Sequence, residues 1–334
     1  MAATMADVAR VARVSKKTVS NYFNGYRYMT ADTRSRIEAA IVELNYKLNL
    51  SARSLSSGRT GTIALAIPEI AHPYFAELAE AVVSAAQRRG MSVVVEVTAG
   101  QHDQELSVLR GTRGRSVDGL IAHPIALGAS DIDSATVDIP VVLVGDRVHS
   151  GPFDFVTVAN EQGAYDMTRF LFEHGRRRIV ALGMEESPVP TAAAQRFDGF
   201  RRAHHDAGVE MVPELLVGPI PWNRLSGAEA IARAIDAGLE FDAVFGLNDA
   251  IALGAMAELQ RQGLTIPGDI AVAGFDDVEE AALAFPPLTT VDSGREWIAE
   301  TAVNRLVELI EVGASEEVPT VTVASHSVKY RASV

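Results

Sequence analysis

Cysteine is absent from this 334-residue sequence. Its absence excludes a disulfide framework and any metal site built on thiolates, and it fits a reducing compartment. No apolar run reaches about 18 residues, the length that a membrane-spanning helix requires. The N-terminus also lacks the apolar segment of a secretory signal peptide. We therefore expect a soluble cytoplasmic protein with no membrane partner.

The common signatures of catalysis are also missing. No Gly-x-Gly-x-x-Gly follows the strands expected near Thr62, Arg178 and Ala243, and neither a P-loop nor Gly-x-Ser-x-Gly occurs. The eight histidines are scattered, and the adjacent pair His204 and His205 points apart on an expected helix, which makes a poor metal site. The sequence therefore disfavours an enzyme, and we expect no metal and no cofactor.

Positive charge is scarce overall but concentrated near the N-terminus. The chain carries a formal net charge of −13. Residues 1–60 hold ten Lys and Arg against four Asp and Glu, a net of +6, so the remaining residues carry −19. A basic segment on an acidic body predicts that the segment contacts phosphate groups and that the body does not.

Residues 4–24 have the pattern of two short helices joined by a tight turn. Thr4 caps the first helix, and Asp7 three residues later completes a capping-box pattern. A turn follows at Arg13, and Ser15 is a suitable N-cap for a second helix over Lys16–Tyr22.

Lys16 and Lys17 occupy the first turn of this second helix. A cation at that position opposes the helix macrodipole and costs about 0.3–1 kcal/mol, so an anionic partner would explain the choice. A short helix with Lys, Thr, Ser and Asn near its N-terminus suits the major groove of DNA. The alternative is a small helical hairpin with a solvated basic face.

A third helix is predicted over Ala31–Leu44, capped by Thr30, and it completes an all-α head over residues 1–46. Residues 47–60 follow as a hinge and linker. Their segment Leu50–Ser57 is weakly helical and has too little apolar surface to fold alone, so it should order only against a partner.

Short apolar runs alternate with helical segments from Thr62 onward, which predicts parallel sheets and an α/β fold. The first elements are strand Thr62–Ile67, helix Pro73–Arg89 and strand Met91–Val97. The later strands are expected at Gly119–Ala122, Val141–Val144, Phe155–Val158, Arg178–Leu182, Glu214–Val217, Ala243–Gly246, Ile270–Phe275, Leu288–Asp292, Pro319–Val323 and Ser327–Tyr330.

The pattern restarts at Glu161, so residues 61–334 should form a core of two doubly wound lobes. We assign about 61–160 and 291–322 to lobe 1 and about 161–290 and 323–334 to lobe 2. Ligand groups are expected in the loops at the carboxyl ends of the strands, with the ligand between the lobes.

Six motifs follow one another along the chain. They are TMADVARVARVSKKTVSNYFNG at the head, Ala52-Arg53-Ser54-Leu55, HPYFAELAEAV, Val117-Asp118-Gly119-Leu120, Gly246-Leu247-Asn248-Asp249 and AVAGFDD…PPLTTV. In this order they resemble the lac repressor family of bacterial transcription regulators over nearly the whole chain. The resemblance implies a helix-turn-helix head, a hinge helix and an effector-binding and dimerisation core like periplasmic sugar-binding proteins. It also implies a homodimer on a pseudo-palindromic operator of double-stranded DNA.

Matching positions suggest how DNA would be bound. Lys16, Lys17 and Asn21 match base-reading positions, and a lysine there favours guanine in each half-site. Leu55 matches a residue that wedges into the minor groove, although it could be an ordinary linker residue. The rest of the DNA-binding set is Thr4, Ser15, Thr18, Ser20, Asn24, Tyr28 and Ala52.

Three positions depart from the family pattern. Arg13 stands where the turn usually has Gly, and it costs on the order of 1 kcal/mol if that residue needs a positive φ. Leu48 replaces the usual Pro before the hinge helix, and Ala159 replaces a common Asp beside Asn160.

The resemblance also suggests a set of effector-facing residues, namely Tyr74, Phe75, Asp146, Arg196, Trp222, Asn248 and Asp276. Their acceptors and donors suit a polyhydroxylated ligand, and the aromatic faces suit a sugar ring or a purine. Four of them have a structural alternative: Phe75 as core, Trp222 as loop packing, Asn248 as a helix cap, and Arg196 in an ion pair with Asp198 or Glu186. Asp277 is also available beside Asp276, which the family pattern favours.

These observations predict an effector-controlled transcriptional repressor that most simply responds to a sugar. A nucleoside- or purine-responsive regulator of the same family is the alternative, and a transport solute-binding protein is less favoured. Inducer or corepressor action, and dimer or tetramer, stay open.

Overall fold

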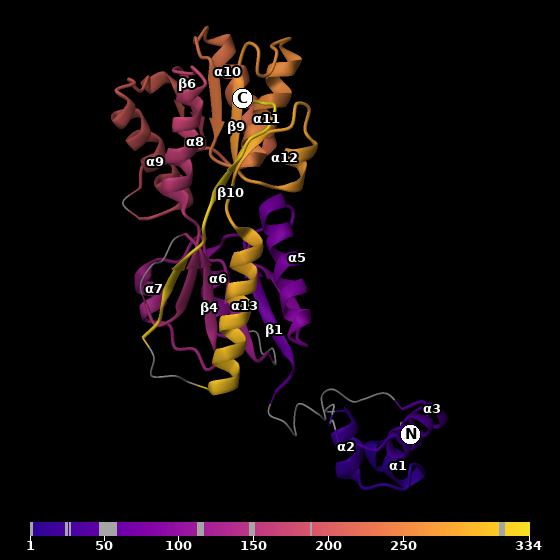
Figure 1. Ribbon diagram of the computed structural model, residues 1–334. Helices are drawn as coiled ribbons and strands as arrows, with labels where there is room; N and C mark the ends of the chain where they lie inside the picture. The colour runs from indigo at the N-terminus through magenta and orange to yellow at the C-terminus, as the bar shows by residue number, and fades with distance from the viewer. Residues whose placement is uncertain are drawn as a thin grey trace. The chain divides into compact units, whose positions relative to one another are not determined.

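The computed structural model describes residues 3–23, 26, 28–46, 59–111, 117–146, 151–187, 189–313 and 318–334. The chain divides into two compact units, Met1–Thr60 and Gly61–Val334 (Figure 1). The first is all helical and the second is mixed α/β, which confirms the predicted fold class. None of the described helices is long and apolar enough to cross a membrane.

The described residues of the head form three helices, α1 (Met5–Val11), α2 (Lys16–Phe23) and α3 (Ala31–Glu43). Its core is formed by small and branched apolar residues spaced at helical intervals, and Val8, Val19 and Ile37 are fully buried in it. Thr4 and Asp7 form the predicted capping box. The backbone N–H of Thr18 donates to Ser15 Oγ at 3.0 Å, so Ser15 caps α2.

The turn between α1 and α2 uses a left-handed residue. Arg13 has φ 53°, where the family pattern has glycine. The N–H of Val14 donates to the carbonyl of Ala9 at 3.0 Å, which closes the turn in the manner of a helix C-terminus. The turn therefore has a positive φ, which glycine adopts easily, and this φ costs on the order of 1 kcal/mol for arginine.

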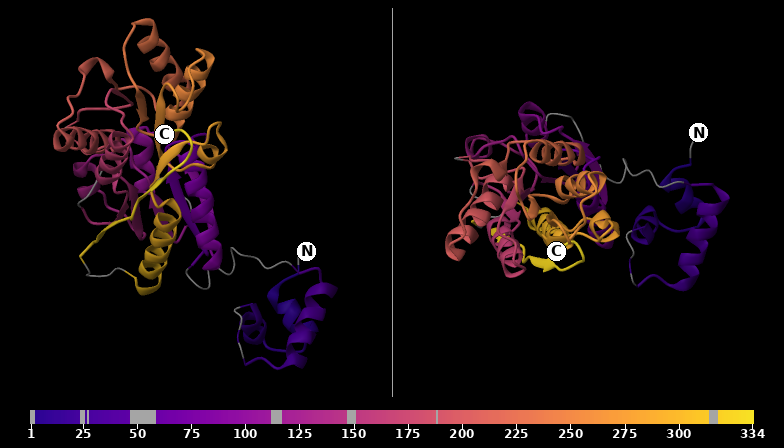
Figure 2. Two further views of the ribbon diagram at one scale, coloured as in Figure 1. Left: turned by 45° about the horizontal axis from the view of Figure 1, so that its top comes forward. Right: turned by 90° about the horizontal axis from the view of Figure 1, so that it is seen from above.

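Lobe 1 is built on a six-stranded, all-parallel sheet in the order β11-β5-β4-β3-β1-β2. Its strands are β1 (Thr62–Ile67), β2 (Ser92–Val97), β3 (Gly119–Ala122), β4 (Val141–Gly145), β5 (Asp154–Thr157) and β11 (Val321–Val323). Its helices are α5 (Pro73–Arg88), α6 (His102–Leu109), α7 (Ala129–Asp133) and α13 (Arg295–Val312). α13 packs beside α5 and against β3 and β4 (Figure 2).

Lobe 2 repeats the design with the order β12-β10-β9-β8-β6-β7, in which only the pairing of β12 with β10 is antiparallel. Its strands are β6 (Ile179–Leu182), β7 (Leu216–Val217), β8 (Ala243–Gly246), β9 (Ala271–Asp276), β10 (Thr289–Asp292) and β12 (Ser327–Lys329). Its helices are α8 (Asn160–Glu173), α9 (Ala192–Ala207), α10 (Arg224–Asp236), α11 (Asp249–Arg261) and α12 (Glu279–Leu283).

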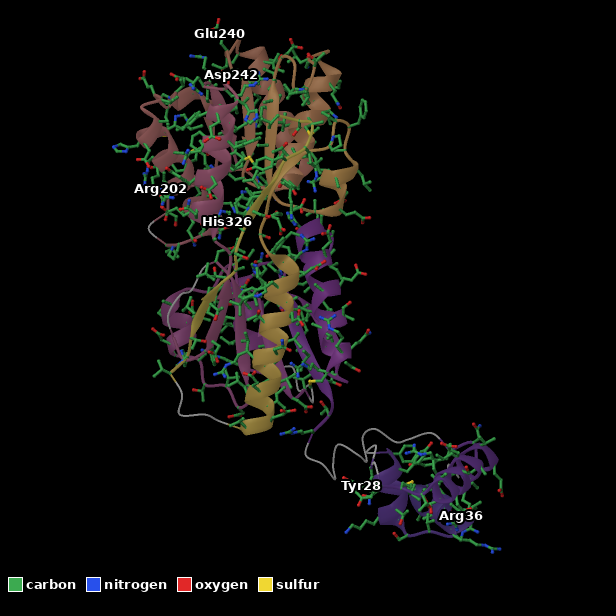
Figure 3. All side chains as sticks on the ribbon, viewed as in Figure 1. Tyr28, Arg36, Arg202, Glu240, Asp242 and His326 are labelled. Atoms are coloured by element: carbon green, nitrogen blue, oxygen red, sulfur yellow. The ribbon has the colours of Figure 1, made fainter. Side chains whose placement is uncertain are left out.

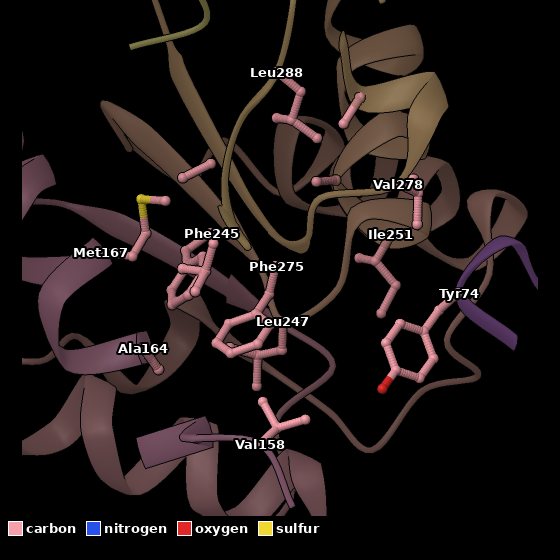
Figure 4. Packing of buried hydrophobic residues seen from close by; sticks show 14 of the residues in the cluster. Tyr74, Val158, Ala164, Met167, Phe245, Leu247, Ile251, Phe275, Val278 and Leu288 are labelled. Carbon is pink, nitrogen blue, oxygen red and sulfur yellow. The ribbon is translucent and has the colours of Figure 1, made fainter. Parts of the chain in front are cut away.

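One apolar cluster runs through lobe 2 and into lobe 1. Phe245 and Phe275 pack together at its centre, and the cluster extends to Val158 and Tyr74 (Figure 4). The central strands are buried along their whole length, as expected for a parallel sheet covered on both faces. The core is therefore continuous where the two lobes meet.

Two details differ from the sequence-based expectations. The strand expected over Glu214–Val217 begins as a 3-10 helix, Pro213–Leu215, because Pro213 cannot donate to a sheet, and only β7 pairs. The lobe border also lies slightly later than 290, since β10 reaches Asp292 in the second sheet and β11 reaches Val323 in the first.

The chain crosses between the lobes three times. It passes from β5 to α8, from β10 to α13, and from β11 to β12. In the last crossing, Nε2 of His326 lies 2.8 Å from Oδ2 of Asp166 on α8 (Figure 3). Three connecting segments therefore join the two lobes.

Candidate functional site

A cavity of about 770 Å³ lies between the two lobes. Its lobe-1 wall includes the start of α5 and the loops that follow β1, β3 and β4, and its lobe-2 wall includes the start of α9 and the loop before α10. Six of the seven predicted effector-facing residues line it, namely Tyr74, Phe75, Asp146, Arg196, Trp222 and Asp276. Parallel strands deliver these side chains because their carboxyl ends share one edge of each sheet.

Arg196 is the central cation of the cleft and is only 4% exposed. Its Nε donates to Oδ1 of Asn160 at 2.7 Å, and its Nη1 donates to the carbonyl of Leu247 at 2.5 Å. Nη1 also lies 3.2 Å from Oδ1 of Asp276. The ion pair is therefore with Asp276, whereas the alternative partner Asp198 pairs with Arg201.

Two aromatic rings flank this guanidinium. Its carbon lies 3.6 Å from the ring centroid of Phe275 and 5.2 Å from that of Trp222. Nε1 of Trp222 donates to the carbonyl of Gly183 at 3.0 Å. That bond satisfies the polar atom of the indole and fixes the ring at the cavity wall, where its face is available for stacking.

Asp276 ends β9 in an unusual backbone conformation. Its φ is 119° and the side chain is buried beneath the cavity. Burial raises the pKa of the Asp276 carboxyl, while the positive charge of Arg196 acts in the opposite direction. Burial and the nearby Asp276 charge raise the pKa of Asp249 well above its ordinary value. Asp276 thus has a buried cation as its partner, whereas Asp249 is held by hydrogen bonds from Val278 and Thr290.

Asp146 connects this cluster to lobe 1. Its Oδ1 accepts a hydrogen bond from Nδ2 of Asn160, and its backbone carbonyl accepts one from Nε2 of Gln195 at 2.8 Å. Asn160 therefore joins Asp146 to Arg196, and a chain of polar contacts runs from lobe 1 to Asp276. Neither Asn160 nor Gln195 was among the predicted site residues.

Asn248 does not line the cavity but lies directly behind it, fully buried. Its Oδ1 accepts from the N–H of Ile251 at 2.9 Å and caps α11, so the capping alternative applies to this oxygen. Its Nδ2 donates to Nε2 of His72 in lobe 1 at 3.0 Å. The same side chain thus fixes a helix and links the lobes.

The lobe-1 wall is aromatic. Phe75 is half-buried and packs against His123 and His72, with ring centroids 5.0 Å and 5.3 Å away. Tyr74 is 8% exposed, and burial, together with the negative charges of Asp146 and Asp276, raises the pKa of its hydroxyl. Phe75 therefore serves as both core and cavity wall. His72 and His123 were missed, although His123 directly follows a predicted strand.

The charged residues of the cleft are mostly acidic. In the described part of the lining there are four carboxylates, Glu69, Asp146, Glu185 and Asp276, against two guanidinium groups. Of these two, Arg196 is engaged by Asp276, and Arg224 is 2.7 Å from Glu280. Among the described residues, no group of three or more His, Asp or Glu is placed to hold a metal ion.

In the head, Lys16 and Lys17 are exposed in the first turn of α2, which contains no acidic residue. Thr18, Ser20 and Asn21 are partly exposed on the same helix. Tyr28 is 85% exposed (Figure 3). Thr4 and Ser15 are used as helix caps. The predicted DNA-binding residues Asn24, Ala52 and Leu55 lie outside the described residues.

Comparison with known proteins decides the family. The pattern of the bacterial regulatory proteins of the lacI family matches residues 4–49, and a periplasmic binding protein-like domain matches residues 168–334. The transcriptional repressor PurR of Aliivibrio fischeri is 32% identical over 312 residues, which is 92% of either chain. This chain belongs to the LacI family of transcription regulators. The family binds DNA and is not a family of enzymes.

Other LacI-family proteins agree with this assignment. The ribose operon repressor of Escherichia coli is 32% identical, with 92% of this chain and 93% of that protein covered. A LacI-family regulator from Sanguibacter keddieii is 40% identical with a TM-score of 0.76, covering 83% of this chain and 99% of that one.

Two solved structures show the family with ligands. A lac repressor dimer bound to operator and the anti-inducer ONPF has a TM-score of 0.83 at 26% identity, with 100% and 99% of the chains covered. A complex of the regulator CelR with cellobiose has a TM-score of 0.70 at 29% identity, with 99% and 100% covered.

Proposed function

We propose that this LacI-family protein is a sequence-specific repressor whose operator affinity is controlled by a sugar or sugar derivative bound between its lobes. The supporting observation is that Asp146, Arg196 and Asp276 line one cavity together with the aromatic rings of Phe75, from lobe 1, and Trp222, from lobe 2. Carboxylates accept from sugar hydroxyls, a guanidinium donates to them, and aromatic rings pack on the apolar face of a pyranose.

The charge of the cleft supports a ligand without phosphate. Among the described lining residues, four carboxylates face the cavity, and the two guanidinium groups each have a carboxylate partner. A phosphate would approach these carboxylates without a free guanidinium from the described lining to balance it, and burying an unpaired charge is costly. A neutral polyhydroxylated molecule avoids that cost.

A nucleoside or purine is the second candidate for the ligand. Phe75 and Trp222 are both partly exposed at the cavity, and their faces could hold a planar base. In that case Asp276 or Asp146 would accept from an exocyclic amine rather than from a hydroxyl.

DNA binding is assigned to residues 1–60. We propose that two copies bind a pseudo-palindromic operator in the cytoplasm, with α2 of each head in a major groove and Lys16, Lys17 and Asn21 at base edges. The exposed lysines in an acid-free first turn support this placement, because they would otherwise oppose the helix macrodipole without compensation. The similar structure of a lac repressor dimer bound to operator supports two copies of the chain per operator.

Tryptophan fluorescence tests the ligand. The chain has two tryptophans, and Trp297→Phe would leave Trp222 at the cavity as the sole reporter. This variant is titrated with ribose, cellobiose and other neutral sugars, with the matched sugar phosphates, and with nucleosides. We expect saturable changes for a neutral sugar and none for its phosphate. Binding of nucleosides alone would favour the second candidate, and tighter binding of a phosphate would contradict the charge argument.

A further inference from the structure

The turn that follows β9 has two consecutive residues in left-handed conformations. Asp276 has φ 119° and Asp277 has φ 55°, and neither is glycine. Such conformations persist only where surrounding groups hold them. The turn matters because it carries the Asp276 carboxylate, which faces Arg196 at the cavity.

Two side chains of lobe 2 hold this turn. Oδ2 of Asp249 accepts from the N–H of Val278 at 3.0 Å. Nη2 of Arg331 lies 2.6 Å from Oδ1 of Asp277. These contacts stay within the lobe and would move with it as a rigid body.

Two further side chains that hold the turn come from lobe 1. Arg295, at the start of α13, donates from Nη1 to the carbonyls of Asp276 at 3.1 Å and Asp277 at 3.4 Å. Glu77, on α5, accepts from the N–H of Glu279 at 2.9 Å through Oε1. Glu77 and Arg295 also form an ion pair with each other. Their side chains are 23% and 16% exposed, so the cluster is largely shielded from water.

We propose that Glu77 and Arg295 are positioning residues of the effector cleft. They never reach the cavity lining, but they hold the backbone on which Asp276 is mounted. The orientation of the Asp276 carboxylate therefore depends on where lobe 1 lies relative to lobe 2. By reciprocity, a ligand that contacts Asp276 biases the arrangement of the lobes through this turn. The inference rests on the proposed effector site.

An ordinary structural ion pair is the competing explanation. Partly exposed pairs contribute little to stability, and their loss is felt locally. The pair Arg88 and Glu300 provides the comparison, because it joins the same two helices at 3.7 Å but stays within lobe 1. A positioning role predicts an effect on lobe 2 from Glu77 and Arg295 that Glu300 does not share.

Hydrogen exchange on the full-length protein tests the first step. The variants are Glu77→Gln, Arg295→Met and, as the matched control, Glu300→Gln. We expect about ten-fold faster exchange at the amides of Val278 and Glu279 in the first two variants. Glu77→Gln removes the charge that strengthens the hydrogen bond from the Glu279 amide, and Arg295→Met removes the donors to the carbonyls of Asp276 and Asp277. Glu300→Gln should leave them unchanged. Unchanged exchange in Glu77→Gln, or an equal increase throughout the core, overturns the proposal.

The fluorescence of Trp222 tests the second step without any ligand. In the Trp297→Phe background, Glu77→Gln should shift the emission maximum, because Trp222 lies beside the Arg196 guanidinium that Asp276 holds. The control Glu300→Gln should not shift it. If the amides of Val278 and Glu279 exchanged faster but the emission of Trp222 did not change, Glu77 would have a purely structural role, and the positioning proposal would be overturned. Both readouts are independent of the sugar titration, so a failed effector assignment would be recognised separately.

Glu77→Gln is isosteric with the unsubstituted side chain. It is sufficient for both measurements if Arg295→Met does not fold.

Discussion

The guanidinium of Arg196 and the carboxylate of Asp276 lie 3.2 Å apart with side chains that are each only 5% exposed. Arg196 reaches this position from α9 and Asp276 from the end of β9, so the pair connects two elements of lobe 2 beneath the cavity. Breaking such a pair leaves one charge buried without its partner, which is far more costly than breaking a surface pair.

The first prediction concerns this pair. Arg196→Met should lower the free energy of unfolding by about 3 kcal/mol, because it leaves the Asp276 charge buried and also removes donors to Asn160 and Leu247. Urea denaturation followed by circular dichroism measures it. Arg201→Met is the control, since the pair of Arg201 with Asp198 is half-exposed and should be worth less than about 1 kcal/mol. Equal losses in the two variants would contradict a special role for the buried pair.

The second prediction concerns pH. Burial and the nearby Asp276 charge raise the pKa of Asp249 above its ordinary value of 3.8. Below that value the carboxyl is protonated in both states. As the pH rises above it, the unfolded chain ionises first, so stability is lost until the folded pKa is passed. Asp249→Asn cannot ionise and should become steadily more stable relative to the unsubstituted protein as the pH rises from about 4.

Asp154 provides the control of opposite sign. Burial opposes its ionisation, but hydrogen bonds from Thr320 and Arg305 outweigh burial and lower the pKa of Asp154. Its stabilising contribution is present above pH 3.8 and is lost as the pH falls through the folded pKa. The free energy of unfolding of Asp249→Asn and of Asp154→Asn is measured at several pH values, relative to the unsubstituted protein. As the pH rises, this difference should increase for Asp249→Asn and decrease for Asp154→Asn. A flat difference for Asp249→Asn would show that the carboxyl titrates normally.

The head and the alternation of strands and helices could be predicted because their signals are local. Thr4 with Asp7, and Ser15 before Lys16, are capping patterns within four residues, and the structure shows both caps. Buried parallel strands are continuous apolar runs, so β8 and β9 were predicted nearly to the residue. The short β7 was not, because its pairing depends on neighbouring strands rather than on its own two residues.

The polar network of the cleft could be predicted only in part. Six predicted residues line one cavity because they lie at the carboxyl ends of strands, in the loops that follow them, or in the first turns of helices. The partners of these residues could not be predicted, since Asn160 lies 36 positions from Arg196 and His72 lies 176 positions from Asn248. The periodicity of a sequence carries no information about contacts between residues so far apart along the chain. Only the folded chain brings Glu77 to the turn at Glu279.

The third prediction concerns base reading by α2. Lys17→Gln should weaken binding to the preferred operator by about 1–3 kcal/mol and relax the preference for guanine at one position in each half-site. A lysine that contacts only phosphate would instead weaken binding uniformly and reduce the salt slope by about 1. Fluorescence anisotropy at several salt concentrations, on an operator selected from random duplexes, separates the two. Arg10→Gln on α1 removes the same charge and should leave base preference unchanged.

The fourth prediction concerns Leu55, which lies outside the described residues and whose role is proposed from the family resemblance alone. A leucine wedged into the minor groove would unstack a base step and kink the duplex, and it would gain apolar contact in return. Leu55→Ala should therefore weaken operator binding by at least about ten-fold and reduce the bend that energy transfer between the ends of the duplex reports. Leu50→Ala is the control in the same segment and should retain the bend.

The response of Trp222 to a sugar should be the same in both variants, because the cavity belongs to the core unit. Full operator affinity in Leu55→Ala would show that the hinge does not act as a wedge, and a reduced sugar response would show that residue 55 acts on the core instead.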